Sequence, residues 1–308
     1  MEQPNPAMSN RSFLKGLQYR FEASAAYALY GLFRVLPVSW ASAFGGQITR
    51  WFGPLSRPHQ TAASNLAHAF PDLSSETLAK IQSEVWDNLG RVSAECAALS
   101  RLWGPEEASR IEVSGAEHIV ELARRGSPAI IFSGHIANWE TLPIAIARMT
   151  KPPAIVYRAP NNPYVDRLLQ SSRRASCKVQ IPKGHGGARD IMREIKAGGF
   201  VAMLIDQKSN TGLPVPLFGR DAMTGDAVAR IAMRFKCPIV PAQIERRNGC
   251  RFKVTFEEPW QTDSMENDEA AIRDLLKRMN EKLETWVRQR PGQWLWVHNR
   301  WPKDSAAS

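Results

Sequence analysis

The chain has 308 residues, 44% hydrophobic and 23% charged, a globular composition that excludes wholesale disorder and allows one large domain or two smaller ones. Its formal net charge is +10, and the excess is concentrated in residues 151–260, which carry 19 basic and 9 acidic side chains. Such a region suits phosphates, anionic lipid head groups or an acidic protein, whereas no signature of a nucleic-acid-binding module accompanies it. The four cysteines form no CxxC pair, which argues against a zinc ribbon or disulfide scaffold and favours a reducing, cytosol-facing location.

The first segment of the chain, residues 1–58, is rich in apolar and aromatic residues. Its uncharged stretch from Ala23 to Phe33 is shorter than the roughly 20 residues of a spanning helix, and Arg34 interrupts it. Two interpretations stay open, an amphipathic helix packed on the domain and a membrane-associating hairpin or tilted anchor. We favour the membrane and predict a membrane-associating segment over 1–58, followed by the main domain over 59–308.

After residue 60 the pattern becomes helical and then alternates. A spacing of three and four between apolar residues predicts a long helix after the turn at 71–74. Strands are expected at 111–113, 129–132, 154–157, 179–181, 200–204, 239–244 and 252–256, and helices at 116–125, 139–149, 163–175, 188–197, 227–235 and 269–288. This alternation predicts an α/β fold with a mixed, largely parallel sheet flanked by helices, preceded by the N-terminal membrane-associating helical segment.

Three polar residues directly follow expected strands: His135, Arg158 and Asp206. In sheets of this kind the chemistry lies in loops at the carboxyl ends of the strands. We therefore expect these side chains to converge at one edge of the sheet.

The stretch FSGHIANWE, residues 132–140, places a histidine at a strand end and a carboxylate five residues later. His135 and Glu140 suggest a base and the group that orients it, with Asn138 as a helix cap between them. The sequence has neither a GxSxG elbow nor an HExxH motif. A base without its own nucleophile suits a reaction in which a substrate hydroxyl attacks, such as acyl transfer to an alcohol. The alternative is a purely structural hydrogen bond between the two residues.

FSGHIANWE resembles the HxxxxE/D block of the bacterial lipid A late acyltransferases, the lauroyl and myristoyl transferase family within the lysophospholipid acyltransferase-like superfamily. Four further segments are similar to blocks of that family in the same order: 64–74 (SNLAHAFPDLS), 156–173 (VYRAPNNPYVDRLLQSSR), 204–225 (LIDQKSNTGLPVPLFGRDAMTG) and 279–301 (MNEKLETWVRQRPGQWLWVHNRW). Together these blocks span most of the chain after residue 60.

The resemblance implies an acyltransferase domain over 59–308, acting at the cytoplasmic face of the inner membrane in lipopolysaccharide biosynthesis. It would move a fatty acyl chain from acyl carrier protein to a hydroxyl of a glycolipid acceptor, a lipid A precursor of the Kdo-lipid A type. By the family pattern His135 is the general base and Glu140 its partner, while Arg158 holds a phosphate. Asp206, Gln207 and Asn138 are then expected to bind substrate. The implied partners are acyl carrier protein, the acceptor and the membrane surface, with no nucleic acid, no metal and no cofactor beyond the acyl donor.

The sequence departs from the family pattern at several positions. Ile136 and Ala137 replace an aromatic residue and a glycine, Lys208 stands where an acidic residue is common, and Asn299 and Trp301 replace Arg and Phe. These changes put the acceptor in doubt, and another glycolipid, a lysophospholipid or an ornithine lipid is the alternative. A metal-assisted hydrolase and a non-catalytic membrane-interaction protein remain as other classes. Arg173 and Arg174 could add a phosphate contact or offset the negative end of the helix that they terminate.

Overall fold

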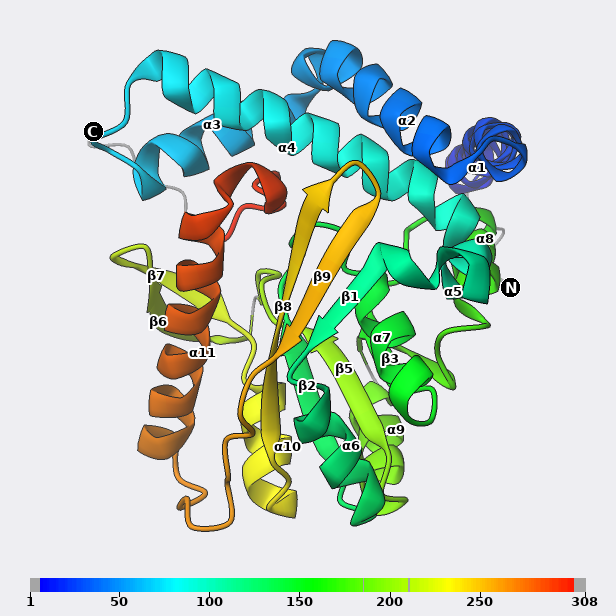
Figure 1. Cartoon of the computed structure of the whole chain (residues 1–308). Coiled ribbons are helices and arrows are strands. Elements are labelled where there is room, and N and C mark those ends of the chain that lie inside the picture. The colour runs from blue at the N-terminus through cyan, green and yellow to red at the C-terminus, as the bar shows by residue number, and fades with distance from the viewer. Residues whose placement is uncertain (1–5, 185, 210, 302–308) are drawn as a thin grey trace.

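A seven-stranded sheet forms the centre of the molecule in the computed structural model, which describes residues 6–184, 186–209 and 211–301 (Figure 1). The strand order is β1-β9-β8-β2-β5-β3-β4. The strands are β1 (Ile111–Ser114), β2 (Ala129–Ser133), β3 (Ala154–Tyr157), β4 (Val179–Pro182), β5 (Phe200–Leu204), β8 (Ile239–Asn248) and β9 (Arg251–Phe256).

The sheet is mixed and largely parallel, as the sequence predicts. Within this seven-stranded sheet β8 and β9 pair antiparallel, and the other pairings among its described strands are parallel. The central strand β2, with the sequence AIIFS, is buried along its whole length. Burial on both faces explains why this strand reads as a continuous apolar run rather than an alternating one.

Helices cover both faces of the sheet. On one face α6 and α7 pack together and against β9, while α9 and α10 cover the other face beside β2, β4 and β5. These helices are α6 (Ala116–Arg124), α7 (Thr141–Met149), α9 (Gly187–Lys196) and α10 (Ala227–Phe235). Two further helices in this part of the chain are α8 (Pro163–Arg173) and α11 (Glu269–Gln289). Over one end of the sheet lie α2 (Val38–Phe52), α3 (Arg57–Ala69) and α4 (Ser75–Glu95), next to the short α5 (Leu99–Trp103) (Figure 1).

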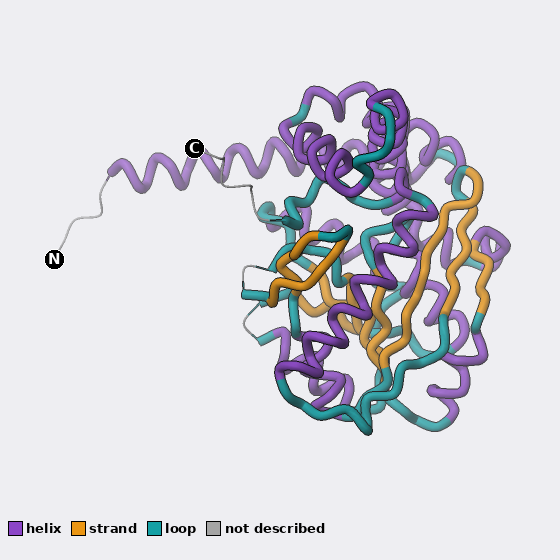
Figure 2. The backbone as a smooth tube through the Cα atoms, turned by 90° about the vertical axis from the view of Figure 1, so that its left-hand side faces the viewer, coloured by secondary structure: helices purple, strands orange, loops and turns teal. Residues whose placement is uncertain are grey.

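The first described element is α1 (Pro6–Val35), whose first turns project away from the body of the molecule (Figure 2). Its later part packs beside α8, where the Asn162 side-chain amide donates to the Tyr19 carbonyl at 2.8 Å. Pro37 separates α1 from α2. Among the described residues, no helix combines the length and the apolar character needed to cross a bilayer.

A small antiparallel hairpin, β6 (Leu213–Leu217) and β7 (Arg220–Thr224), packs against α11 and was not expected from the sequence. The prolines in LPVPL indicate a stiff loop, because proline cannot donate to a strand ladder. In the structure Pro214 and Pro216 are exposed and alternate with the buried Val215 and Leu217. The hairpin has only two strands, so the backbone nitrogen of each proline, which has no hydrogen to donate, can face away from the partner strand.

Candidate active site

The sheet brings His135 and Asp206 together at the carboxyl ends of two neighbouring strands. β2 and β5 pair in parallel with Ser133 opposite Leu204, and the Ile205 amide donates to the Ser133 carbonyl at 3.0 Å. Two residues further on, the same register places His135 opposite Asp206. The predicted convergence of these two side chains is therefore confirmed, and it follows from strand order and register.

Asp206 holds both the backbone and the ring of His135. One carboxylate oxygen accepts a hydrogen bond from the His135 amide at 2.6 Å and another from the Trp294 indole at 2.7 Å, and the other oxygen lies 2.7 Å from His135 Nδ1. Burial by itself would raise the pKa of Asp206, but the charge of His135 and these hydrogen bonds outweigh burial and hold the pKa well below its ordinary value. An ionised Asp206 accepts from Nδ1 and so fixes the ring tautomer.

The other ring nitrogen, Nε2, lies 3.3 Å from the Gln207 side-chain amide nitrogen. An amide nitrogen can only donate, so this contact matches a ring with its proton on Nδ1 and a lone pair on Nε2. Trp139 and His298 flank the ring, with centroids 4.9 and 5.7 Å from that of His135. His135 is thus positioned as an acceptor of one proton.

Glu140 does not orient His135 in the structure. Its carboxylate accepts two hydrogen bonds from the Arg173 guanidinium, at 2.8 and 2.5 Å, and a third from the Trp139 indole at 3.1 Å. The described residues show no hydrogen bond between Glu140 and His135, and Asp206 takes the orienting position instead. The reason is local: Ala137 turns the loop with a positive φ of 51°, and Glu140, the N-cap residue of α7, then faces Arg173 at the end of α8.

Arg173 therefore belongs to a buried ion pair. The two guanidinium nitrogens that donate to Glu140 are not free to bind a phosphate, which the sequence suggested as one role of Arg173. Burial alone would lower the pKa of Arg173, but the charge and hydrogen bonds of Glu140 raise it overall. Arg174 is exposed.

Asn138 is fully buried and does not line the cavity, so the structure does not place it as a substrate-binding residue. Its side-chain oxygen accepts from the Glu140 amide at 3.0 Å, and its side-chain nitrogen donates to Glu95 at 2.8 Å. The helix begins at Thr141 with Glu140 as its N-cap, so Asn138 is not the cap residue that the sequence predicts, although it accepts from the Glu140 amide just before the helix.

A cavity of about 450 Å³ opens beside His135. Most of its wall is apolar and comes from the ends of β3 and β5 and from α7, α9 and α10, through residues that include Leu142, Ile155, Ile191, Met203, Val228 and Ile231. The polar groups on its wall include His135, Glu140, Gln207 and Arg173. The cavity is thus a deep apolar space with a base and a few polar groups at one place.

Basic side chains gather on the same wall: Arg158, as predicted, and Lys183. Arg158 is exposed and makes no hydrogen bond or ion pair with another described residue. Burial, together with the nearby charges of Arg300 and Arg158, lowers the pKa of Lys183. Burial, His135 and the same arginines lower the pKa of His298. Cations that disfavour one another's charge form a site suited to an anion.

Sequence reasoning missed Trp294, His298 and the Glu140–Arg173 pair. All three depend on the segment after α11 or on the end of α8, which pack on the site from distant parts of the chain. The dense aromatic run WLWVHNRW was the available signal, since so many large side chains in a coil segment indicate burial. No group of three histidine, cysteine, aspartate or glutamate side chains suitable for a metal ion occurs in the part of the chain that the structure describes.

The chain is similar to known proteins over most of its length. The profile of the bacterial lipid A biosynthesis acyltransferase family matches residues 11–303. The lipid A biosynthesis myristoyltransferase of Escherichia coli (strain K12) is 24% identical over 256 residues, covering 82% of this chain and 77% of that protein. The lipid A biosynthesis acyltransferase of Haemophilus influenzae is 22% identical over 257 residues, covering 82% of this chain and 78% of that protein.

Among solved structures, the 1-acyl-sn-glycerophosphate acyltransferase of Thermotoga maritima superposes with a TM-score of 0.40 at 12% identity, covering 86% of this chain and 97% of that one. The family profile, in contrast, extends over nearly the whole sequence. The chain belongs to the bacterial lipid A biosynthesis acyltransferase family and is an acyltransferase.

Proposed function

We propose that this enzyme transfers a fatty acyl chain from acyl carrier protein to a hydroxyl of a lipid A precursor, with His135 as the general base. The observation that carries the proposal is the arrangement of His135, held by Asp206 on one side and bordering a deep apolar cavity on the other. A base beside an apolar cavity suits an acyl donor whose chain is buried while its thioester stays at the polar end.

In the proposed reaction the acceptor hydroxyl takes the place of the Gln207 amide at His135 Nε2. The hydroxyl oxygen attacks the thioester carbonyl carbon as Nε2 takes the hydroxyl proton. The imidazolium that forms is stabilised by ionised Asp206. When the carbon–sulfur bond breaks, the proton passes from Nε2 to the departing sulfur, so the products are the ester and the free thiol of the carrier. His135 ends in its starting state.

Arg158 and Lys183 would bind a phosphate at the cavity mouth. Both side chains line the cavity. Burial, and after it the charges of Arg300 and Arg158, lowers the pKa of Lys183, and a bound anion would favour the charged form of this lysine. A phosphate is present on the lipid A precursor and also in the prosthetic group of acyl carrier protein. The basic surface would further attract the acidic carrier.

The N-terminal segment would place the enzyme on the inner membrane at its cytoplasmic face. α1, α2 and the turn after α2 expose large apolar side chains, among them Phe21 (78%), Trp40 (70%), Trp51 (63%) and Leu55 (81%). Exposed basic residues lie on the same helices: Lys15, Arg20, Arg34 and Arg50. Aromatic and basic side chains together are typical of a surface that lies in the lipid head-group region. Because α1 contacts the chain just before α8, this surface adjoins the segment that carries Arg158.

Sedimentation with vesicles tests this placement. Replacing Trp40 and Trp51 by serine should release the protein from vesicles that contain anionic phospholipid, while Val120→Ser, at an exposed apolar position on α6, should leave binding unchanged. Equal release of the Trp40/Trp51 variant and of Val120→Ser would contradict a membrane-binding surface formed by α1 and α2.

The function itself is tested by offering purified enzyme acyl-loaded carrier protein together with one of three acceptors. These are a Kdo-modified lipid A precursor, a lysophospholipid and an ornithine lipid precursor. We expect mass spectrometry to detect one added acyl chain on the lipid A precursor alone. Acylation of one of the other two acceptors would support acyl transfer and refute the lipid A precursor as the acceptor. Acylation of none of the three would refute the proposal.

A further inference from the structure

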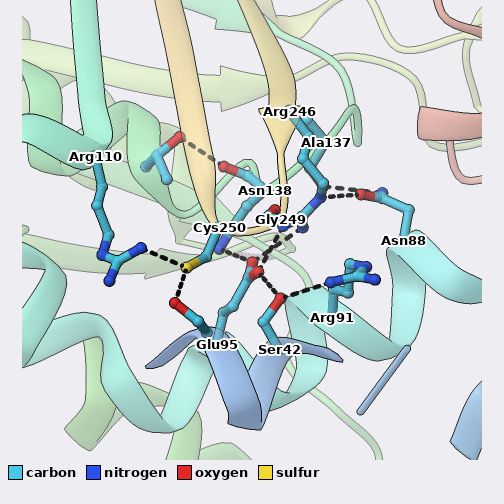
Figure 3. A network of polar contacts seen from close by, with 12 residues as sticks. Ser42, Asn88, Arg91, Glu95, Arg110, Ala137, Asn138, Arg246, Gly249 and Cys250 are labelled. Atoms are coloured by element: carbon cyan, nitrogen blue, oxygen red, sulfur yellow. Dashed lines mark hydrogen bonds and ion pairs between the residues drawn. The ribbon is translucent and has the colours of Figure 1, made fainter. Parts of the chain in front are cut away.

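A buried polar network supports the loop that carries His135, and none of the side chains that form it lines the cavity (Figure 3). Its centre is an ion pair between Glu95, at the end of α4, and Arg246, on β8. Glu95 is fully buried and Arg246 is 8% exposed. An ion pair this deep is a weak source of stability, but the removal of either partner leaves an uncompensated buried charge.

Each oxygen of Glu95 is fully used. One accepts from Arg246 at 2.5 Å and from the Ser42 hydroxyl of α2 at 2.6 Å. The other accepts from Arg246 at 3.0 Å and from the Asn138 side-chain amide at 2.8 Å. Because Asn138 is three residues after His135, Glu95 directly holds the catalytic loop.

Arg246 holds the same loop by a second route. Its Nε donates to the Asn88 side-chain oxygen at 2.9 Å, which fixes the orientation of that amide. The Asn88 nitrogen then donates to the Ala137 carbonyl at 3.0 Å. Both routes therefore end on consecutive residues of the loop, Ala137 and Asn138.

The loop needs such support because Ala137 has a φ of 51°. This is the left-handed region, which costs a residue with a Cβ free energy and is kept only where surrounding contacts impose it. Released from those contacts, Ala137 would favour an ordinary conformation, and the turn between His135 and α7 would change.

We propose that Glu95 and Arg246 are positioning residues for His135, acting through Asn138 and Asn88 to hold the loop in its left-handed turn. The inference rests on the proposed function of His135 as the base. Glu95 and Arg246 do not line the cavity, so their loss should lower the turnover rate and leave substrate affinity unchanged. A base displaced by about 1 Å can lose about 10²-fold in rate.

The test is a reciprocal exchange of donor and acceptor. Asn138→Asp sets two carboxylates against each other. Glu95→Gln by itself still offers an amide oxygen to the Asn138 donor and loses a hydrogen bond from Arg246 instead. In the double variant Asn138→Asp/Glu95→Gln, the amide at position 95 donates to the carboxylate at 138, one Arg246 nitrogen loses its acceptor, and one negative charge remains beside Arg246. We expect Asn138→Asp to lower kcat by about 10²-fold with KM for donor and acceptor unchanged, and the double variant to recover at least about tenfold.

Thr262→Val is the matched control. Its hydroxyl, also buried, donates to the carbonyls of Ala232 and Cys237 near the start of β8, away from the loop. It should lower thermal stability and leave kcat per folded molecule unchanged. If Glu95→Gln does not fold, Asn138→Asp decides by itself.

Wild-type kcat per folded molecule in Asn138→Asp, or no recovery in the double variant, would overturn the inference. A readout independent of turnover is the proton on His135 Nδ1, followed by NMR with nitrogen-labelled histidine and assigned by its loss in His135→Ala. Its signal should shift in Asn138→Asp and stay in place in Thr262→Val. An inactive wild type would contradict only the proposed function. An unchanged His135 Nδ1 proton signal in Asn138→Asp would overturn this inference whether or not the wild type is active.

Discussion

Replacing Asp206 by asparagine should reverse the tautomer of His135. In the structure one oxygen of Asp206 accepts from two N–H groups, those of the His135 backbone and the Trp294 indole, and the other faces His135 Nδ1. An asparagine oxygen is needed at the two-donor position, so the amide nitrogen must face Nδ1. Because that nitrogen can only donate, Nδ1 becomes the acceptor and the ring proton moves to Nε2.

A ring with its proton on Nε2 cannot take the proton of the acceptor hydroxyl. The same loss of tautomer in a Ser-His-Asp triad costs about 10⁴-fold, and we expect about 10³–10⁴-fold here, or about 4–5.5 kcal/mol of transition-state stabilisation. The assay is the initial rate of acyl transfer from acyl carrier protein to the lipid A precursor, normalised to folded enzyme. Asp221→Asn makes the same chemical change at an exposed position on β7 and should retain full activity. A loss below about tenfold in Asp206→Asn would refute the assignment of Asp206 as the orienting group.

Three further changes test the packing and charge of the site. A Cβ at Gly134 would lie 2.6 Å from Leu283 Cδ1 and 3.1 Å from Asp206 Oδ2. Gly134→Ala should therefore lower the free energy of unfolding, measured in urea, by about 1–3 kcal/mol and should also lower kcat. An unchanged free energy and kcat would contradict this packing. Arg173→Met should lower the free energy of unfolding by about 3–5 kcal/mol, because it leaves the buried Glu140 without its partner. The double variant Arg173→Met/Glu140→Gln should recover most of that stability. A double variant as unstable as Arg173→Met would contradict the pairing. Because folding lowers the pKa of Asp206, the stability that its ionised carboxylate contributes is complete above the ordinary value of 3.8 and is lost on acidification. The stability difference between wild type and Asp206→Asn should therefore shrink below about pH 4, whereas a difference that grows on acidification would contradict an ionised Asp206.

The sheet and the position of the site could be predicted because both follow from local patterns. Short apolar runs bounded by polar residues marked β2, β3 and β5 to within a residue or two, and the rule for strand ends then grouped His135 with Asp206. What failed was the choice of partner. Glu140 is near His135 in sequence, whereas Asp206 is near it only through the pairing of β2 with β5, and no spacing within one chain segment reveals that pairing.

The hairpin of β6 and β7 and the support of the loop were hidden for a related reason. Two prolines in LPVPL argued against a strand, and only the edge position of β6 makes them acceptable. Glu95 and Arg246 are 151 residues apart, and each alone reads as an ordinary charged residue on a surface. Their burial is a property of the tertiary fold.

The role of His135 as the base in acyl transfer is tested most directly by comparing wild type with His135→Ala. Each is incubated with acyl-loaded carrier protein and the Kdo-modified lipid A precursor, and the added acyl chain is quantified by mass spectrometry. Removal of a general base should lower the rate by at least about 10²-fold while the variant unfolds at a temperature near that of wild type. Transfer by a folded His135→Ala enzyme at the wild-type rate would contradict the account.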